Sequence, residues 1–171
     1  MAGELPALPG EKPLMSDWVD HMSTAFPEVR LKQFLEMRGA DGGPWSRLCA
    51  LPAFWVGLFY DTDASDAAWD LIKDWKVEEI QALRDEVPHQ ALNARLRNRT
   101  VKEIALDVLQ FSHKGLKNRA RLDSVGLDET HFLNPLFQIA HSGLTPAEEM
   151  LAAYEGRWGQ SVDPVFQEYA Y

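Results

Sequence analysis

Apolar and charged positions alternate between Val29 and Arg38, and this period of two predicts one β-strand over residues 29–38. The apolar face carries Val29, Leu31, Leu35 and Met37, and the opposite face carries Arg30, Lys32, Phe34, Glu36 and Arg38. A strand must pair through its backbone groups, and the sequence offers no second convincing strand. We therefore expect the partner strands to lie upstream in a longer protein.

The residues before this strand predict a loop and a short helix, at residues 1–28. Three prolines and a glycine fall within residues 5–13, which favours an extended loop over a helix. Ser16 stands where the N-cap of the helix is expected, and Pro27 is expected to end that helix.

In residues 44–171, the spacing of apolar positions and the capping signals predict helices. A very apolar stretch begins at Pro44 and predicts a buried helix that Pro52 interrupts or bends. Two later helices open with a threonine and a glutamate at the spacing of a capping box, in the pairs Thr100–Glu103 and Thr145–Glu148. The chain is therefore predicted to be α+β and mostly helical.

Composition and charge exclude several classes of protein. The 171 residues carry a formal net charge of −9 and a pI near 5.0, which argues against binding nucleic acid through overall charge. No apolar run reaches the roughly 20 residues of a membrane span, and the N-terminus lacks the apolar core of a secretory signal. The lone cysteine, Cys49, allows no disulfide within the chain and suits a reducing compartment. We therefore expect a cytoplasmic protein that binds neither membrane nor nucleic acid.

The charged face of the predicted strand is the strongest candidate for chemistry. Such a face is most often simply solvated. Here Phe34 interrupts the charges, and a glycine-rich turn and an apolar segment follow, so charges paired with a ligand are the alternative. Glu36 and Arg38 leave the same face about 7 Å apart. That pair suits a carboxylate that holds a divalent cation beside a guanidinium that holds an oxyanion, as phosphoryl transfer requires.

Two long blocks of the sequence resemble the glutamate–cysteine ligases of the plant and proteobacterial type. The blocks are "FPEVRLKQFLEMRGADGGPWSRLCALPAFWVGLFYD" and "TPAEEMLAAYEGRWGQSVDPVFQEYAY". The resemblance covers almost the whole chain and is least distinctive over residues 76–125. It implies the C-terminal part of a single catalytic domain, residues 1–171, with the predicted strand belonging to an antiparallel sheet like that of glutamine synthetase.

The resemblance also implies roles for individual residues, because Glu36, Met37 and Arg38 match an E-x-R strand of glutamine synthetase-like enzymes. Glu36 would be a magnesium ligand. Arg38 would be catalytic and would hold the side-chain carboxylate of the substrate glutamate and the phosphate that it receives.

Four further residues are candidates for substrate binding. Arg30 and Lys32 share the charged face, Asp41 lies in the following turn, and Arg47 lies near the start of the next helix. Other interpretations stay open for three of them. Arg30 and Lys32 would equally form ion pairs at the rim of a sheet, and Asp41 would equally shape the turn.

The reaction implied by the resemblance joins L-glutamate to L-cysteine with ATP and Mg²⁺, through γ-glutamyl phosphate, and is the first step of glutathione biosynthesis. The expected partners are glutamate, cysteine, ATP and the N-terminal remainder of the enzyme. The 171 residues alone are expected to be inactive, because one wall of a site cannot bind all these ligands. Two alternatives remain, a carboxylate–amine ligase with another amine acceptor and a non-catalytic helical interaction module.

Other reactive side chains have simpler interpretations. Cys49 follows an apolar helix position and is expected to be a buried, inert thiol. A basic run comprises Lys114, Lys117, Arg119 and Arg121. It is either a solvated helix end or a surface for ATP phosphates. The five histidines lack metal-ligand spacing, so no zinc site is predicted.

Overall fold

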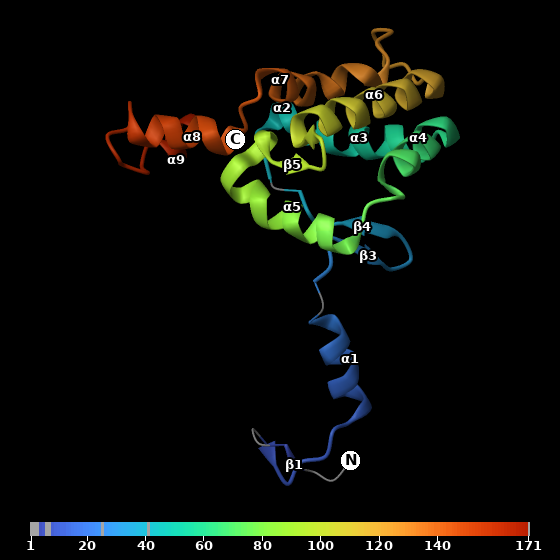
Figure 1. Cartoon of the computed structure of the whole chain (residues 1–171), viewed down its shortest axis with the longest axis vertical. Coiled ribbons are helices and arrows are strands. Elements are labelled where there is room, and N and C mark those ends of the chain that lie inside the picture. Colours follow the sequence, from blue (N-terminus) through green and yellow to red (C-terminus); the bar gives the residue numbers. More distant parts are fainter. Residues whose placement is uncertain (1–3, 6–7, 25, 41, 171) are drawn as a thin grey trace. The chain divides into compact units, whose positions relative to one another are not determined.

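The computed structural model describes residues 4–5, 8–24, 26–40 and 42–170. The chain divides into two compact units, residues 1–41 and residues 42–171, and each is described by itself. The element order confirms the predicted α+β class, since short antiparallel strand pairs accompany a mostly helical chain (Figure 1).

The first unit begins with a small strand pair and a helix. Strands β1 (Glu4–Leu5) and β2 (Leu8–Pro9) are antiparallel, and helix α1 spans Met15–Ser23. The N-cap of α1 is Leu14 and not the predicted Ser16. The correction has a local cause, because the Asp17 carboxylate accepts a hydrogen bond from the Leu14 N–H at 2.6 Å.

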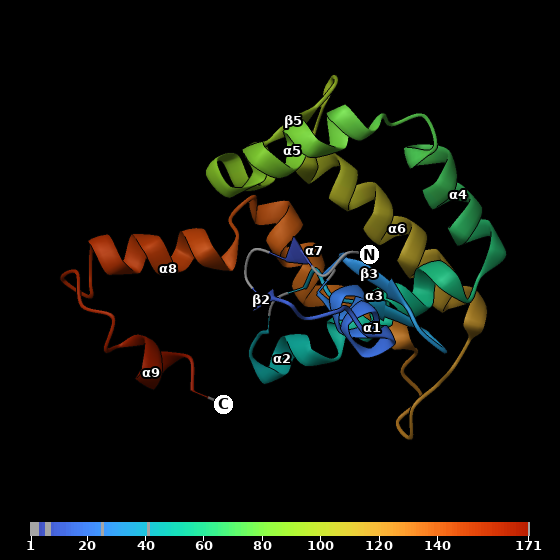
Figure 2. The ribbon, with the colours of Figure 1, turned by 90° about the horizontal axis from the view of Figure 1, so that it is seen from below.

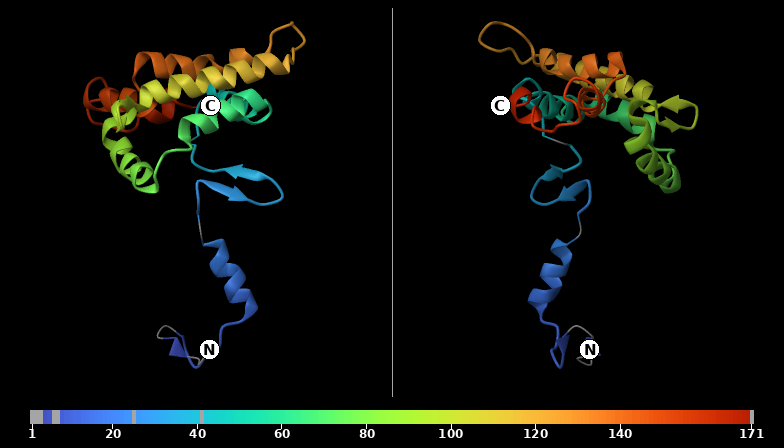
Figure 3. Two further views of the ribbon diagram at one scale, coloured as in Figure 1. Left: turned by 45° about the vertical axis from the view of Figure 1, so that its right-hand side comes forward. Right: turned by 90° about the vertical axis from the view of Figure 1, so that its left-hand side faces the viewer.

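The predicted single strand over residues 29–38 is instead a β-hairpin (Figure 3). Strands β3 (Val29–Leu31) and β4 (Leu35–Met37) pair antiparallel, and the Lys32 N–H donates to the Phe34 carbonyl at 2.9 Å across the turn. The expectation that the strand pairs only with an upstream segment is therefore corrected. Alternation alone did not distinguish the two structures, because residues an even number of positions apart share a face in either one.

The second unit is mostly helical and contains one small hairpin. Its elements are α2 (Trp45–Leu48), α3 (Ala50–Phe59), α4 (Thr62–Ile72), α5 (Val77–Gln90), η1 (Ala91–Asn93), β5 (Arg95–Leu96), β6 (Arg99–Thr100), α6 (Val101–Arg119), η2 (Glu129–Leu133), α7 (Asn134–Ser142), α8 (Pro146–Glu155) and α9 (Val165–Glu168). The β5–β6 hairpin lies inside the 44–171 segment that was predicted to be entirely helical.

Helix ends follow the local signals of the sequence. Both predicted capping boxes are present, at the start of α6 and of α8. The apolar stretch after Pro44 is interrupted, as predicted, but the break lies at Cys49, between α2 and α3. Pro52 falls in the first turn of α3, where a backbone N–H has no partner within the helix.

Helices α3 and α6 form the centre of the second unit (Figure 2). Gly57 and Gly115 allow their backbones to approach closely, since a Cβ atom added at Gly115 would lie 1.9 Å from the Gly57 carbonyl oxygen. The fully buried Ser112 hydroxyl donates to the Phe54 carbonyl at 2.9 Å across the same crossing. Leu116 and Leu133 are fully buried beside it and form the core.

Helices α8 and α9 extend away from this helical core (Figures 1 and 2). Contacts within this segment join α9 to the residues that follow α8. The Glu168 carboxylate accepts a hydrogen bond from the Trp158 indole at 2.8 Å and forms an ion pair with Arg157. Trp158 is 8% exposed, so this aromatic side chain is buried. None of the helices in the described part of the chain is long and apolar enough to span a bilayer.

Candidate functional site

Four charged side chains of the first unit meet on one face of the β3–β4 hairpin. The hairpin cluster, as we call it, consists of Arg30, Lys32, Glu36 and Arg38. Arg30 and Glu36 are directly opposed in the strand register, and the Arg30 Nε donates a hydrogen bond to the Glu36 Oε2 at 2.7 Å. The Lys32 Nζ and an Arg38 terminal nitrogen each lie 3.9 Å from the same oxygen. Three cations therefore surround one carboxylate.

The surrounding residues hold Arg38 from two sides. Its backbone N–H donates to the Glu28 carbonyl at 2.7 Å, which ties the end of β4 to the chain before β3. Its guanidinium lies 5.2 Å from the centre of the Phe26 ring. The Arg38 side chain is 30% exposed and carries its charge at the surface of the hairpin.

The electrostatics of the hairpin cluster favour a charged Glu36. The hydrogen bond from Arg30 is the largest cause that lowers the pKa of Glu36 below its ordinary value of 4.5, and the charges of Arg30, Lys32 and Arg38 lower it further. The side chain is 32% exposed, so solvent weakens these interactions. The cluster as a whole keeps an excess of positive charge, which suits an anionic ligand.

A magnesium ion fits Glu36 only as one ligand of a shared site. No hydrogen bond from the described residues reaches the second oxygen of the carboxylate, Oε1. The described residues contain no group of three or more His, Cys, Asp or Glu side chains that could hold a metal ion by themselves. Magnesium commonly binds through one or two carboxylates together with substrate phosphates and water, and a single carboxylate meets that requirement.

The two other predicted site residues have separate outcomes. Asp41 lies outside the described residues. Arg47 belongs to the second unit, where it sits in the four-residue helix α2 with its side chain against Gly43. Phe34, which was expected within the charged face, lies in the hairpin turn and is 62% exposed.

The other candidates have structural roles. Lys114, Lys117 and Arg119 of the basic run pair with Asp63, Asp128 and Glu129, so the helix-end interpretation accounts for these three. Cys49 is exposed, and the expectation of a buried thiol is wrong because Cys49 occupies the junction between α2 and α3 instead of a helix interior.

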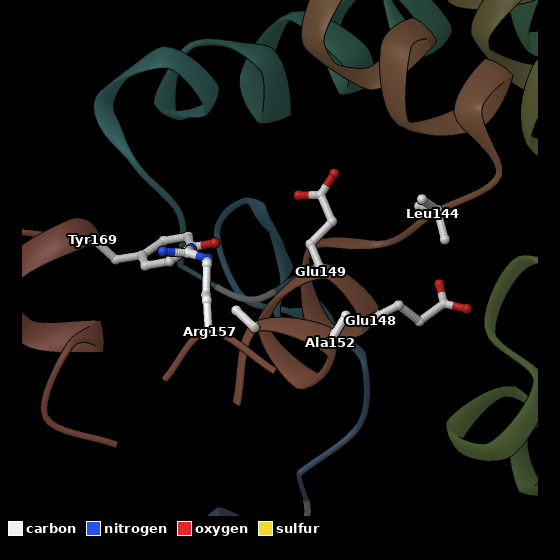
Figure 4. Close-up of a pocket in the computed structure, with 7 residues that line it drawn as sticks. Leu144, Glu148, Glu149, Ala152, Arg157 and Tyr169 are labelled. Atoms are coloured by element: carbon white, nitrogen blue, oxygen red, sulfur yellow. The ribbon is translucent and has the colours of Figure 1, made fainter. Parts of the chain in front are cut away.

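A groove on α8 was not predicted from the sequence. It has a volume of about 560 Å³ and is lined by Leu144, Glu148, Glu149, Ala152, Ala153, Arg157 and Tyr169. Glu148 and Glu149 point in different directions in Figure 4. The Glu148 carboxylate is engaged by Thr145 in the capping box. The residues that line the groove come from α8 and from segments on either side of it, and the capping box at Glu148 predicts a helix start but not a groove.

Comparison with known proteins decides what kind of chain carries the hairpin cluster. The sequence matches the family described as glutamate-cysteine ligase family 2 (GCS2) over residues 3–168. The chain belongs to this family. It is 53% identical over all 171 residues to the chloroplastic glutamate–cysteine ligase of Arabidopsis thaliana, and 52% identical to that of Brassica juncea. It is 50% identical to the chloroplastic glutamate–cysteine ligase A of Oryza sativa subsp. indica.

The match to these relatives is complete for this chain but partial for theirs. The chain covers 32% of the Arabidopsis and Brassica ligases and 34% of the Oryza ligase, so it spans about a third of their length. The family resemblance inferred from the two sequence blocks is confirmed.

The expected cytoplasmic location is contradicted by the same comparison. The relatives at about 50% identity are named chloroplastic ligases. The expectation rested on a lone cysteine and an N-terminus without an apolar core. Neither feature distinguishes one reducing compartment from another.

Proposed function

We propose that this chain works as the C-terminal third of an ATP-dependent ligase that joins L-glutamate to L-cysteine. The observation that carries the proposal is the match to family 2 over residues 3–168, together with full-length similarity to ligases of that name. The hairpin cluster supports it, because a surface with one carboxylate among three cations suits a phosphorylated, anionic substrate.

The proposed reaction has two steps. An oxygen of the glutamate side-chain carboxylate attacks the γ-phosphorus of ATP, and ADP leaves with the electrons of the broken P–O bond. The cysteine amine then attacks the carbonyl carbon of the mixed anhydride, and phosphate leaves as the amide forms. The amine loses a proton to the surrounding solvent. A free carboxylate is a poor electrophile, which is why the first step is needed.

Residues of the hairpin cluster have distinct roles in this proposal. Arg38 is the catalytic residue, since its guanidinium would hold the carboxylate oxygens and then the transferred phosphoryl group, where negative charge develops. Glu36 would supply one ligand to magnesium, which neutralises phosphate charge when it is bound. The Lys32 side chain is 47% exposed, and we propose it as a substrate contact. We propose the same role for Arg47 and Asp41.

The experiment is best done in a ligase that carries this chain in place of the matching 171 residues of the Arabidopsis thaliana relative. ATP turnover to ADP is measured with glutamate and cysteine together and with each alone. We expect turnover that needs both amino acids. Arg38→Ala is expected to lower kcat/KM by about a hundredfold or more, as loss of a transition-state charge contact does.

Arg95→Ala is the matched control. Arg95 is an exposed arginine of the second unit, and the one side-chain hydrogen bond that it donates to a described residue goes to the Asn98 carbonyl in its own hairpin, at 3.1 Å. It should leave turnover unchanged. Unaltered turnover in Arg38→Ala would remove the assigned role of Arg38, and turnover that ignores cysteine but accepts another amine would favour a different carboxylate–amine ligase.

A further inference from the structure

The pair formed by Arg30 and Glu36 differs from the other contacts of the hairpin cluster. Directly opposed residues on an antiparallel pair of strands have Cβ atoms about 4.5–5.5 Å apart. Their side chains can therefore contact each other without any change in the backbone. Arg30 and Glu36 occupy such positions, on β3 and β4 respectively. Their side chains are 28% and 32% exposed, and the Nε–Oε2 distance is 2.7 Å. The hairpin backbone therefore fixes this hydrogen bond.

The contacts to Glu36 are also unequal between its two oxygens. Arg30, Lys32 and Arg38 all make their closest approach to Oε2. Lys32 and Arg38, each at 3.9 Å, are too distant for a hydrogen bond, so among the described residues Arg30 alone orients the carboxylate. Oε1 receives no hydrogen bond from any described residue and is left available to a ligand.

We propose that Arg30 is a positioning residue, which holds Oε2 of Glu36 so that Oε1 is presented to a divalent cation. This inference rests on the proposed function and decides between the two interpretations of Arg30, because a guanidinium engaged by Glu36 acts through that carboxylate and not on the substrate. Outer partners that orient a metal-binding carboxylate typically change metal affinity by about ten- to hundredfold when they are removed. A planar guanidinium fixes the angle of its partner, whereas a lysine ammonium acts as a point charge.

The charge of Arg30 and its orienting hydrogen bond to Glu36 have opposite expected effects on the binding of a cation. Arg30 and Lys32 both repel a divalent cation at Glu36, so removing either charge should tighten cation binding if charge alone matters. Removing Arg30 also frees the carboxylate to rotate, which should weaken binding if orientation matters. Arg30→Gln and Lys32→Gln each remove one positive charge and therefore make a matched pair.

The test measures Mn²⁺ binding without turnover, in the same full-length ligase that carries this chain. Mn²⁺ is titrated and the free ion is followed by electron paramagnetic resonance. Glu36→Gln identifies the bound ion that depends on this carboxylate. For that ion we expect Arg30→Gln to weaken binding by about ten- to hundredfold, Arg30→Lys to have an intermediate effect, and Lys32→Gln to leave binding unchanged within about twofold or slightly tighter.

Two outcomes overturn the inference. Equal or tighter Mn²⁺ binding in Arg30→Gln would show that Arg30 contributes charge and no orientation. Unchanged Mn²⁺ binding with a raised KM for glutamate would make Arg30 a substrate contact. Arg30→Lys keeps the positive charge and serves as the second variant in case Arg30→Gln does not fold. A thermal unfolding midpoint equal to that of the unsubstituted protein shows that Arg30→Lys is folded. If the unsubstituted protein binds Mn²⁺ at Glu36 but does not join glutamate to cysteine, the proposed function fails while the positioning role still stands or falls on the Mn²⁺ titration.

Discussion

Two carboxylates of this chain, Glu36 and Glu79, are each held by an arginine from a neighbouring element. Glu36 on β4 accepts from Arg30 on β3. Glu79 in the first turn of α5 accepts two hydrogen bonds from Arg97, which lies in the turn between β5 and β6, both at 2.7 Å. In each case the arginine hydrogen bond is the largest cause of a lowered pKa, and for Glu79 the pKa falls to about 2.

The lowered pKa of Glu79 predicts an acid-dependent loss of stability. A carboxyl group whose pKa is lower in the folded state stabilises the fold fully above its unfolded pKa, near 4.5, and loses this contribution as the pH falls towards about 2. Glu79→Gln removes the titrating group. The difference in unfolding midpoint between the unsubstituted chain and Glu79→Gln should therefore shrink between pH 4.5 and pH 2, as measured by circular dichroism.

Glu78→Gln is the control for this titration. Glu78 lies in the same first turn of α5, and no hydrogen bond or ion pair to it is found in the described part of the chain. Its substitution should leave the acid dependence of the midpoint as it is in the unsubstituted chain. Parallel pH profiles for the two variants would contradict the role assigned to the Glu79–Arg97 pair.

At the scale of the elements, helices α3 and α6 cross at a very short distance between their backbones. The backbones meet at Gly57 and Gly115 with no room for a side chain, and Ser112 spans the crossing by a hydrogen bond. The fully buried Leu116 packs one turn along α6, next to Leu133. The spacing of these helices therefore sets the shape of the core.

Gly115→Ala is expected to destabilise the chain by about 1–3 kcal/mol, because a methyl group at this position forces the two helices apart. The free energy of unfolding from a urea titration measures the effect. Gly39→Ala is the control, since a Cβ atom there meets only ordinary contacts, at 3.8 Å from Glu28. A similar free energy for both variants would show that the close approach at Gly115 is dispensable.

Across the whole molecule, many large apolar side chains remain exposed. In the first unit, every large apolar side chain of α1 is exposed, Met15 at 75% and Trp18 at 59%, and Leu31 of the hairpin is 79% exposed. Exposed apolar surface of this extent is typical of an interaction surface. It agrees with a chain that spans about a third of the length of its relatives.

The 171 residues alone are expected to turn over no ATP in the presence of glutamate, cysteine and Mg²⁺. The described residues contain no group of three or more His, Cys, Asp or Glu side chains that could hold a metal ion, whereas phosphoryl transfer depends on several groups that position the phosphates and neutralise their charge. ADP release by a coupled assay checks this, with the full-length ligase that carries the chain as the positive control. Turnover by the isolated chain would show that the site is complete within it.

Local sequence signals were sufficient for much of the secondary structure. The capping boxes at Thr100 and Thr145 fixed the starts of two helices as predicted, because each depends on groups within a few residues. The N-cap of α1 was missed, since Asp17 rather than Ser16 bonds the free backbone group. The β5–β6 hairpin was missed because strands of two residues carry almost no periodic signal.

For the candidate site, the sequence by itself determined that Arg30, Glu36 and Arg38 share a face, because side-chain direction alternates along an extended chain. It also determined the family, through long blocks of matching residues. Only the tertiary structure decided that the strand folds back as a hairpin, that Arg30 binds one oxygen of Glu36, and that Gly57 meets Gly115. These are distances between residues that the chain must first bring together, and spacing along the sequence fixes directions but not such distances.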